Sequence, residues 1–96
     1  MAATIIVELE ITDTAGFEEY RKLVPASLAA YEGRFLVRGG THETLEGAWH
    51  PQRMVVLEFP SLTRAKQWWD SPEYRDAKAM RQRTAKTSMI MVEGVA

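Results

Sequence analysis

Apolar and polar side chains alternate in four segments of the chain, which is the pattern of a β-strand with one buried face. In the first segment, residues 3–11, Ile5, Val7 and Leu9 share one face while Glu8 lies on the other. The remaining segments are residues 34–38, 53–59 and 87–93. We therefore expect four strands.

Between the first two strands, apolar residues recur every three or four positions over residues 17–31, as on one face of a helix. Residues 12–14 are Thr, Asp and Thr, which are types that cap helix N-termini. Pro25 lies inside this stripe, so we expect a kink or a short break near residues 23–25. Gly33 is expected to end the helix in the left-handed conformation.

A second helical region lies between the third and fourth strands. Ser61 can cap a helix that reaches about Trp69, and Ser71 followed by Pro72 begins another that reaches about Ala85. The inner side of the latter helix is predicted to hold Tyr74, Ala77, Met80, Arg81 and Thr84. The order strand, helix, strand, strand, helix, strand is that of a ferredoxin-like α+β fold, βαββαβ, with a four-stranded antiparallel sheet and the helices on one face.

Length and charge narrow the possible functions. The chain has 96 residues, which fits a single domain over residues 1–96, and its 12 basic and 13 acidic side chains nearly balance. A balanced charge disfavours nucleic acid as a partner, and we interpret the basic residues between Arg75 and Lys86 as a solvated helix face.

The chain contains no cysteine, which excludes disulfides, thiolate metal sites and cysteine nucleophiles, and fits a cytoplasmic location. No apolar run has the roughly 18 residues of a membrane helix, and the first residues lack the pattern of a signal peptide. We therefore expect no membrane partner.

The face of the predicted sheet that points away from the helices mixes apolar and charged residues. Its predicted members are Ile6, Glu8, Glu10, Leu36, Arg38, Met54, Val56 and Glu58. Because large exposed apolar patches usually mark interaction sites, we expect two copies to stack sheet to sheet as a homodimer. The alternative is a solvated sheet with scattered apolar residues.

Three long segments of this chain resemble the domain of unknown function 1330 family. They are YRKLVPASLAAYEGRFLVRGG, LEGAWHPQRMVVLEFPS and WWDSPEYRDAKAMR, and the resemblance covers about residues 7–94. That family is similar in fold to the dimeric α+β barrels, in which two ferredoxin-like units pack sheet against sheet. The superfamily includes cofactor-free monooxygenases, muconolactone isomerase-like enzymes and haem enzymes, but the family itself has no established reaction.

Two residues are candidates for acid–base catalysis. His42 follows the second strand, and histidine is a residue type suited to proton transfer at neutral pH. Glu58, beside Val56, is a candidate base with a raised pKa if it is desolvated, or else an ion-pair partner of Arg34 or Arg38 on the neighbouring strand.

The segment between the second and third strands holds four possible metal ligands, His42, Glu43, Glu46 and His50. A helical zinc motif would need His at position 46, and the neighbouring glycines disfavour a helix. We therefore interpret the segment as a polar hairpin connection and predict neither a metal nor another cofactor.

Five side chains are candidates for ligand binding in a small pocket between the sheet and the helices. Arg38 or Arg53 can hold an anionic group, and Tyr20, Trp49 or Tyr74 can pack on the body of a small organic acid or aromatic metabolite. If the protein is an enzyme, we expect cofactor-free proton transfer or oxygenation with His42 as the base. The alternative function is that of a non-catalytic structural or regulatory dimer.

Overall fold

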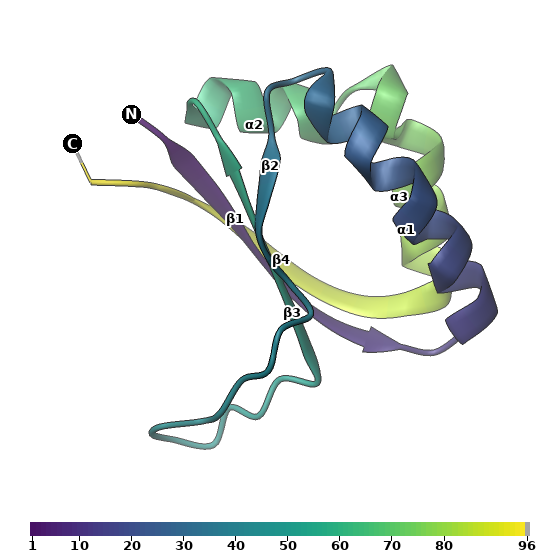
Figure 1. Ribbon diagram of the computed structural model, residues 1–96, viewed down its shortest axis with the longest axis vertical. Helices are drawn as coiled ribbons and strands as arrows, with labels where there is room; N and C mark the ends of the chain where they lie inside the picture. The colour runs from purple at the N-terminus through teal and green to yellow at the C-terminus, as the bar shows by residue number, and fades with distance from the viewer. Residues whose placement is uncertain (96) are drawn as a thin grey trace.

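The computed structural model describes residues 1–95 and consists of one sheet covered on one face by helices (Figure 1). The strands are β1 (Ala3–Ile11), β2 (Arg34–Arg38), β3 (Arg53–Phe59) and β4 (Ala85–Glu93). The helices are α1 (Thr14–Ala29), α2 (Leu62–Trp69) and α3 (Pro72–Thr84). The sheet order is β2-β3-β1-β4 with every neighbouring pair antiparallel, which confirms the predicted ferredoxin-like fold.

Residues 39–52 connect β2 to β3 without helix or strand and project beyond the end of the sheet (Figure 1). The four strands lie where the alternation predicted them, except that β4 begins at Ala85, two residues before the predicted start at Thr87. None of the helices in the described residues is long and apolar enough to cross a bilayer.

Helix α1 begins as predicted but is not broken in its middle. The carboxylate of Asp13 accepts a hydrogen bond from the Gly16 amide at 3.1 Å, which caps the N-terminus. The helix then continues through Pro25, so of the two expected alternatives near residues 23–25, a kink or a short break, the break is wrong. Proline lacks an amide hydrogen, so it leaves the carbonyl four residues earlier, that of Arg21, without its usual helical donor.

Gly33 ends the helical segment for a different reason from the one predicted. The left-handed residue is Glu32, with φ of 60°, and Gly33 donates its amide hydrogen to Leu28 at 2.8 Å. A Cβ atom at Gly33 would lie 2.5 Å from the Phe59 ring. Glycine is therefore required here by the close approach of β3.

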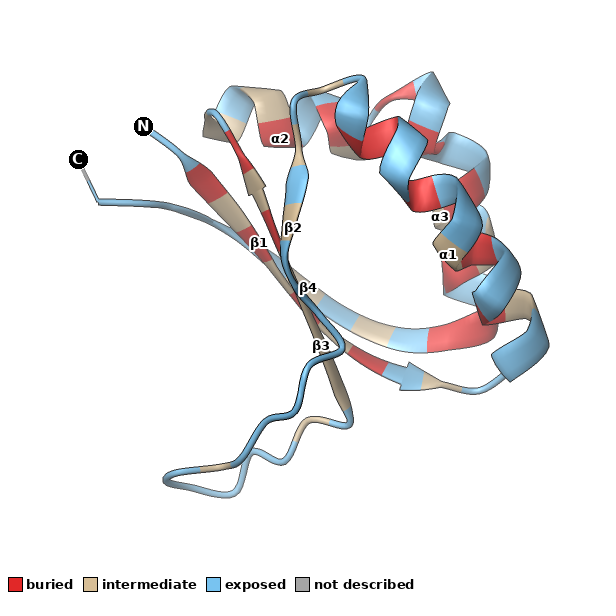
Figure 2. Ribbon diagram, in the orientation of Figure 1, coloured by how far each residue is buried: buried red, intermediate tan, exposed pale blue. Residues whose placement is uncertain are grey.

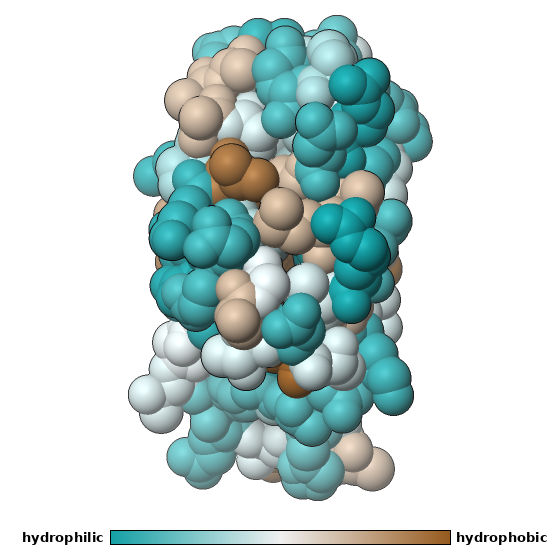
Figure 3. Space-filling model, turned by 90° about the vertical axis from the view of Figure 1, so that its right-hand side faces the viewer, coloured by the Kyte–Doolittle hydropathy of each residue, from teal (hydrophilic) through white to brown (hydrophobic). Residues whose placement is uncertain are grey.

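The hydrophobic core lies between the sheet and the helices. Buried positions alternate along β1, at Ala3, Ile5, Val7 and Leu9, and recur on the helices (Figure 2). The side of the molecule formed by α1 and α3 is largely hydrophilic at its surface (Figure 3). The largest fully buried side chains are Trp68, Tyr74, Phe17 and Phe59.

A β-bulge in β2 changes which side chains face the helices. Phe35 pairs with Leu57, but Val37 pairs with Val56 and Arg38 with Val55, so one extra residue stands in β2 at this point. Because a shift of one residue exchanges the two faces of a strand, Arg38 points toward the helices and Val37 away from them. The predicted placement of Arg38 on the outer face is therefore wrong.

Candidate functional site

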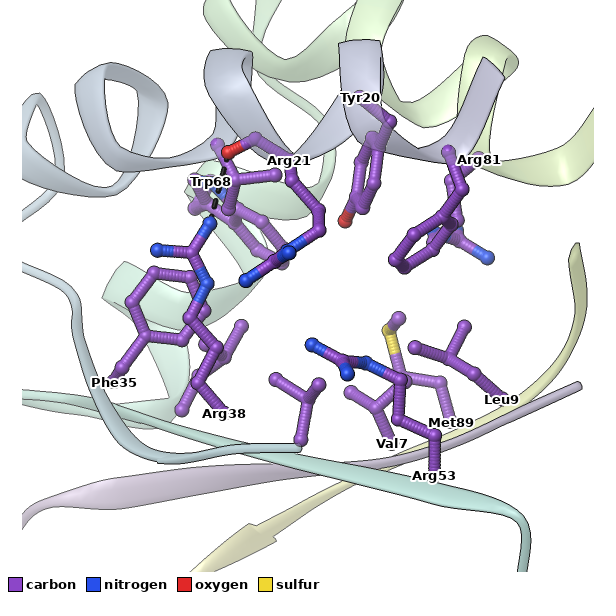
Figure 4. Close-up of a pocket in the computed structure, with 14 residues that line it drawn as sticks. Val7, Leu9, Tyr20, Arg21, Phe35, Arg38, Arg53, Trp68, Arg81 and Met89 are labelled. Carbon is purple, nitrogen blue, oxygen red and sulfur yellow. Dashed lines mark hydrogen bonds between the residues drawn. The ribbon is translucent and has the colours of Figure 1, made fainter. Parts of the chain in front are cut away.

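A cavity lies between the helix-covered face of the sheet and the helices (Figure 4). Its floor is apolar and comes from three strands, with Val7 and Leu9 on β1, Val55 and Leu57 on β3, and Met89 on β4. The empty space amounts to about 420 Å³, including the open mouth. The enclosed part of this space is only about 30 Å³, so a ligand larger than a water molecule or two must also occupy the open mouth.

Four arginines line this cavity, and each comes from a different element. Arg21 lies on α1, Arg38 on β2, Arg53 on β3 and Arg81 on α3. No Asp or Glu is among the described residues that line the cavity. A carboxylate outside the lining, that of Glu18, pairs with Arg21 at 3.2 Å on the surface. The cavity therefore holds an excess of positive charge.

The positive charge around the cavity changes the pKa of Arg53. Burial lowers the pKa of Arg53, and the neighbouring cations Arg21 and Arg38 lower it further, while Glu18 opposes them. The Nε atoms of Arg53 and Arg21 are buried and have no hydrogen-bond partner. Buried donors are normally paired, so these two are available to an acceptor from outside the chain.

Arg53 is held in place by packing rather than by a counter-ion. Its guanidinium lies 5.8 Å from the centroid of the Phe17 ring. Gly39 lies against it as well, and a Cβ atom at this position would overlap Arg53 Nη1. Gly39 also has φ of 72°, a conformation that favours glycine. The end of β2 thus leaves room for the Arg53 side chain.

Arg38 is held by the carbonyl that Pro25 leaves free. Arg38 Nη2 donates to the carbonyl oxygen of Arg21 at 2.9 Å (Figure 4). In a regular helix this oxygen would accept from the amide of residue 25, which proline lacks. The guanidinium of Arg38 also lies 4.3 Å from the centroid of the Phe35 ring. The proline in α1 and the bulge in β2 together place Arg38 at the cavity.

The fourth arginine belongs to a buried chain of hydrogen bonds. Arg81 is only 3% exposed, and its Nε donates to the Tyr74 hydroxyl at 3.2 Å. The Tyr74 hydroxyl lies 3.0 Å from that of Tyr20, whose oxygen points into the cavity (Figure 4). Burial raises the pKa of Tyr20 far above its ordinary value, and Tyr74 raises it further, while Arg81 opposes the shift. Tyr20 therefore stays protonated at neutral pH.

Of the five predicted ligand-binding residues, the structure brings three to the cavity. Tyr20, Arg38 and Arg53 line it, while Tyr74 lies behind Tyr20. Trp49 lies on the opposite face of the sheet, where its Nε1 donates to Glu8 at 2.9 Å. The placement of Trp49 beside a ligand on the helix side is therefore a wrong expectation.

Sequence reasoning missed Arg21 and Arg81 as cavity residues. The prediction that Arg81 lies on the inner side of α3 is confirmed, whereas its assignment to a solvated basic face is wrong, because its side chain is buried. The available signal was its position seven residues after Tyr74, on the predicted inner side of the helix. Arg21 directly follows the buried stripe residue Tyr20, and no pattern in the sequence distinguishes it from a surface residue.

Neither predicted catalytic residue lies at the cavity. His42 is in the β2–β3 connection, where its Nε2 lies 2.6 Å from the Pro51 carbonyl oxygen. Glu58 is on the outer face and pairs with Arg34 at 2.6 Å, which is the ion pair considered from the sequence. Because side chains alternate between the two faces of a strand, Glu58 on β3 and Glu8 on β1 point away from the helices. The geometry therefore joins neither His42 nor Glu58 to Tyr20.

The residues in the β2–β3 connection that carry metal-binding atoms remain apart. Over residues 1–95, no three His, Asp or Glu side chains come together as a metal site would require. His42, Glu43 and Glu46 instead border an open pocket that Trp49 also lines.

Almost the whole chain matches one family of known sequences. Residues 2–95 match the family described as Domain of unknown function (DUF1330). The chain belongs to this family. No curated protein matches this DUF1330 chain significantly.

Solved structures with the same fold include several proteins of unknown function. One from Rhodopseudomonas palustris has 16% identity and a TM-score of 0.78, covering 99% of this chain and 83% of the other. A dimeric ferredoxin-like protein from Jannaschia sp. CCS1 has 13% identity and a TM-score of 0.73, covering 98% and 100%. A cofactor-independent oxygenase from Streptomyces nogalater has 10% identity and a TM-score of 0.64, covering 99% and 94%. At these identities, the likeness establishes the fold of the DUF1330 chain and not its activity.

Proposed function

We propose that this protein binds a small organic anion with an apolar body in the cavity between its sheet and helices. The observation that carries the proposal is the set of four arginines around an apolar floor that no carboxylate lines among the described residues. Bringing like charges together in a partly desolvated space is unfavourable, and an anionic ligand removes that penalty. The planar guanidinium groups suit a carboxylate, which accepts two parallel hydrogen bonds.

The apolar floor determines the rest of the ligand. Val7, Val55 and Met89 offer no hydrogen bonds, so they favour hydrocarbon or aromatic surface. This combination supports a small organic acid or an acidic aromatic metabolite as the ligand, rather than an inorganic anion alone.

The same lining favours one kind of chemistry. Positive charge and buried donors stabilise a negative charge that develops on a ligand oxygen, because the donors are oriented before the reaction begins. We propose oxygenation of a bound organic anion by molecular oxygen without a cofactor, in which a CH2 group becomes a carbonyl and its two hydrogens leave with the second oxygen atom as water. The Streptomyces nogalater protein is described as a cofactor-independent oxygenase, which supports this reaction class. The described lining residues include no His, Asp or Glu, so proton abstraction by His42 or Glu58 is not part of this proposal.

Isothermal titration calorimetry with 4-phenylbutyrate and its neutral amide tests the binding proposal. We expect the acid to bind at least about tenfold more tightly than the amide, and Arg53→Gln to remove most of this preference. Arg34→Gln is the matched control, because Arg34 pairs with Glu58 on the outer face. Equal binding of the acid and the amide to the wild-type protein would overturn the proposal.

We also propose that two copies associate through the outer face of the sheet. This face exposes apolar side chains on both edge strands, Val37 on β2 and Ile90 and Val92 on β4. The partly buried Ile6 on β1 and Val56 on β3 lie between them. The Jannaschia protein is described as dimeric and supports the same assembly.

Sedimentation velocity should give a dimer that Ile90→Asp converts to a monomer. Leu23→Asp, on the exposed side of α1, should leave the dimer intact, and a monomeric wild type would refute the proposal.

A further inference from the structure

The hydroxyl of Tyr20 has a spare hydrogen, and the hydrogen bonds around it show where this hydrogen points. Tyr74 is fully buried, and its oxygen accepts from Arg81 Nε at 3.2 Å. Its own hydrogen then needs an acceptor, and the Tyr20 oxygen at 3.0 Å is the acceptor that the described residues provide. If Tyr20 were the donor instead, the Tyr74 hydroxyl would remain buried without an acceptor, which is costly.

It follows that Tyr74 donates to Tyr20 and that the hydrogen of Tyr20 is left for the cavity. The Tyr20 oxygen points into the cavity in Figure 4, and the hydrogen bonds of the described residues give its hydrogen no acceptor other than the Tyr74 oxygen. The chain from Arg81 through Tyr74 polarises this hydroxyl in one direction, since each member donates to the next. Tyr20 is thus a neutral donor directed at the ligand.

The unpaired polar groups of the cavity are therefore all donors. Arg21 Nε and Arg53 Nε are buried and unpartnered, and Tyr20 adds one uncharged O–H group. Charged donors favour an anionic group, whereas a neutral hydroxyl suits an uncharged acceptor such as a ketone oxygen. A cavity with donors of both kinds therefore fits a ligand that carries an anionic group and also an uncharged oxygen acceptor.

We propose that the ligand is an oxo acid, whose anionic group pairs with Arg21, Arg38 and Arg53 and whose carbonyl oxygen accepts from Tyr20. This inference rests on the proposed binding of an organic anion and specifies which acids the cavity prefers. Tyr20 then distinguishes an oxo acid from the same acid without the carbonyl, because only the oxo acid uses its hydrogen. An unused buried donor is a penalty for the plain acid.

Two matched pairs of acids test the inference by isothermal titration calorimetry. They are 3-benzoylpropionate with 4-phenylbutyrate, and phenylglyoxylate with phenylacetate. Within each pair the acids share an aromatic ring and a carboxylate and differ by one carbonyl. In at least one pair we expect the wild-type protein to bind the oxo acid about tenfold more tightly.

Tyr20→Phe should reduce this preference to about one while leaving the affinity for the plain acid within about twofold. The ratio of the two affinities is insensitive to a general loosening of the fold, which weakens both acids alike. Arg53→Gln should weaken both acids and keep the ratio. Tyr74→Phe, which breaks the link to Arg81 but keeps the Tyr20 hydroxyl, should reduce the ratio only in part.

The outcomes separate the two proposals. Binding of neither acid overturns the proposed function and this inference together. Tight binding of both acids with equal affinity in both pairs overturns this inference alone. A preference for the oxo acid that survives Tyr20→Phe also overturns it, because another group would then recognise the carbonyl.

Discussion

Arginine and tryptophan occur on both faces of the sheet, and their partners differ between the faces. On the outer face, Arg34 pairs with Glu58 at 2.6 Å, and Trp49 is more than half exposed. On the helix face, Arg53 has no carboxylate within 4 Å among the described residues, and Trp68 is only 1% exposed.

The difference between the two faces indicates which arginines serve binding rather than structure. An arginine whose charge is balanced within the chain contributes to structure or solubility. Arginines that outnumber the nearby carboxylates in a partly buried cavity, as four do here with only Glu18 paired to one of them, instead destabilise the unoccupied protein. Such an arrangement is explained most simply by an anion from outside the chain.

Replacing the two tryptophans should give the largest difference in the free energy of unfolding. Trp68 is stacked on Tyr74 with ring centroids 4.0 Å apart, and its Nε1 donates to Ser27. We expect Trp68→Ala to lower the free energy of unfolding by about 3–5 kcal/mol, as for a large core residue. Trp49→Ala should cost less than about 1.5 kcal/mol, since it removes an exposed ring and one hydrogen bond. Urea denaturation measures both, and equal losses would remove the distinction between the faces.

Replacing Pro25 tests how α1 serves the cavity. Pro25→Ala restores an amide hydrogen that can bond to the Arg21 carbonyl, in competition with Arg38 Nη2. We expect the variant to be more stable by about 1–3 kcal/mol, because a helix-interior proline is unfavourable. We also expect it to bind 4-phenylbutyrate several-fold more weakly. Thermal denaturation and calorimetry measure the two effects, and unchanged affinity would show that this carbonyl does not position Arg38.

Two arginine substitutions should change stability in opposite directions. Arg53→Gln removes one of the crowded cations and should stabilise the unliganded protein by about 0.5–1 kcal/mol. Arg34→Gln removes an ion pair on the outer face and should destabilise by about 0.2–1 kcal/mol. Denaturation in low-salt buffer free of organic acids is the measurement. Loss of stability in both variants would indicate that the Arg53 charge is balanced within the chain.

A surface pair gives the smallest effect and a direct pH dependence. Tyr31 donates to Glu73 at 2.8 Å, and this hydrogen bond lowers the pKa of Glu73 below its ordinary value. Because the folded pKa is depressed, the contribution to stability is present above the unfolded pKa and is lost as the pH falls through the folded value. In Tyr31→Phe, NMR titration should show a higher Glu73 pKa. The stability difference from the wild type should shrink at acid pH, and an unchanged pKa would contradict the assignment.

Hydrophobic periodicity and capping residues were enough to predict the strands, most helix ends and the order of elements, because each depends on neighbours in sequence. The alternation in β1 and the cap at Asp13 are examples. The faces of β3 were also predicted correctly, since β3 carries no bulge. Tyr20 and Arg53, which the sequence predicts as ligand-binding residues from their chemistry, both line the cavity.

The site itself depended on tertiary structure. A bulge of one residue turned Arg38 from the outer face to the cavity, and no local pattern marked it. Arg81 became buried only because α3 packs against α1, which brings Tyr74 to Tyr20 across 54 positions of sequence. Local sequence determines which face of an element is apolar, but the register of strands and the packing of helices decide which charges meet and which remain without a partner.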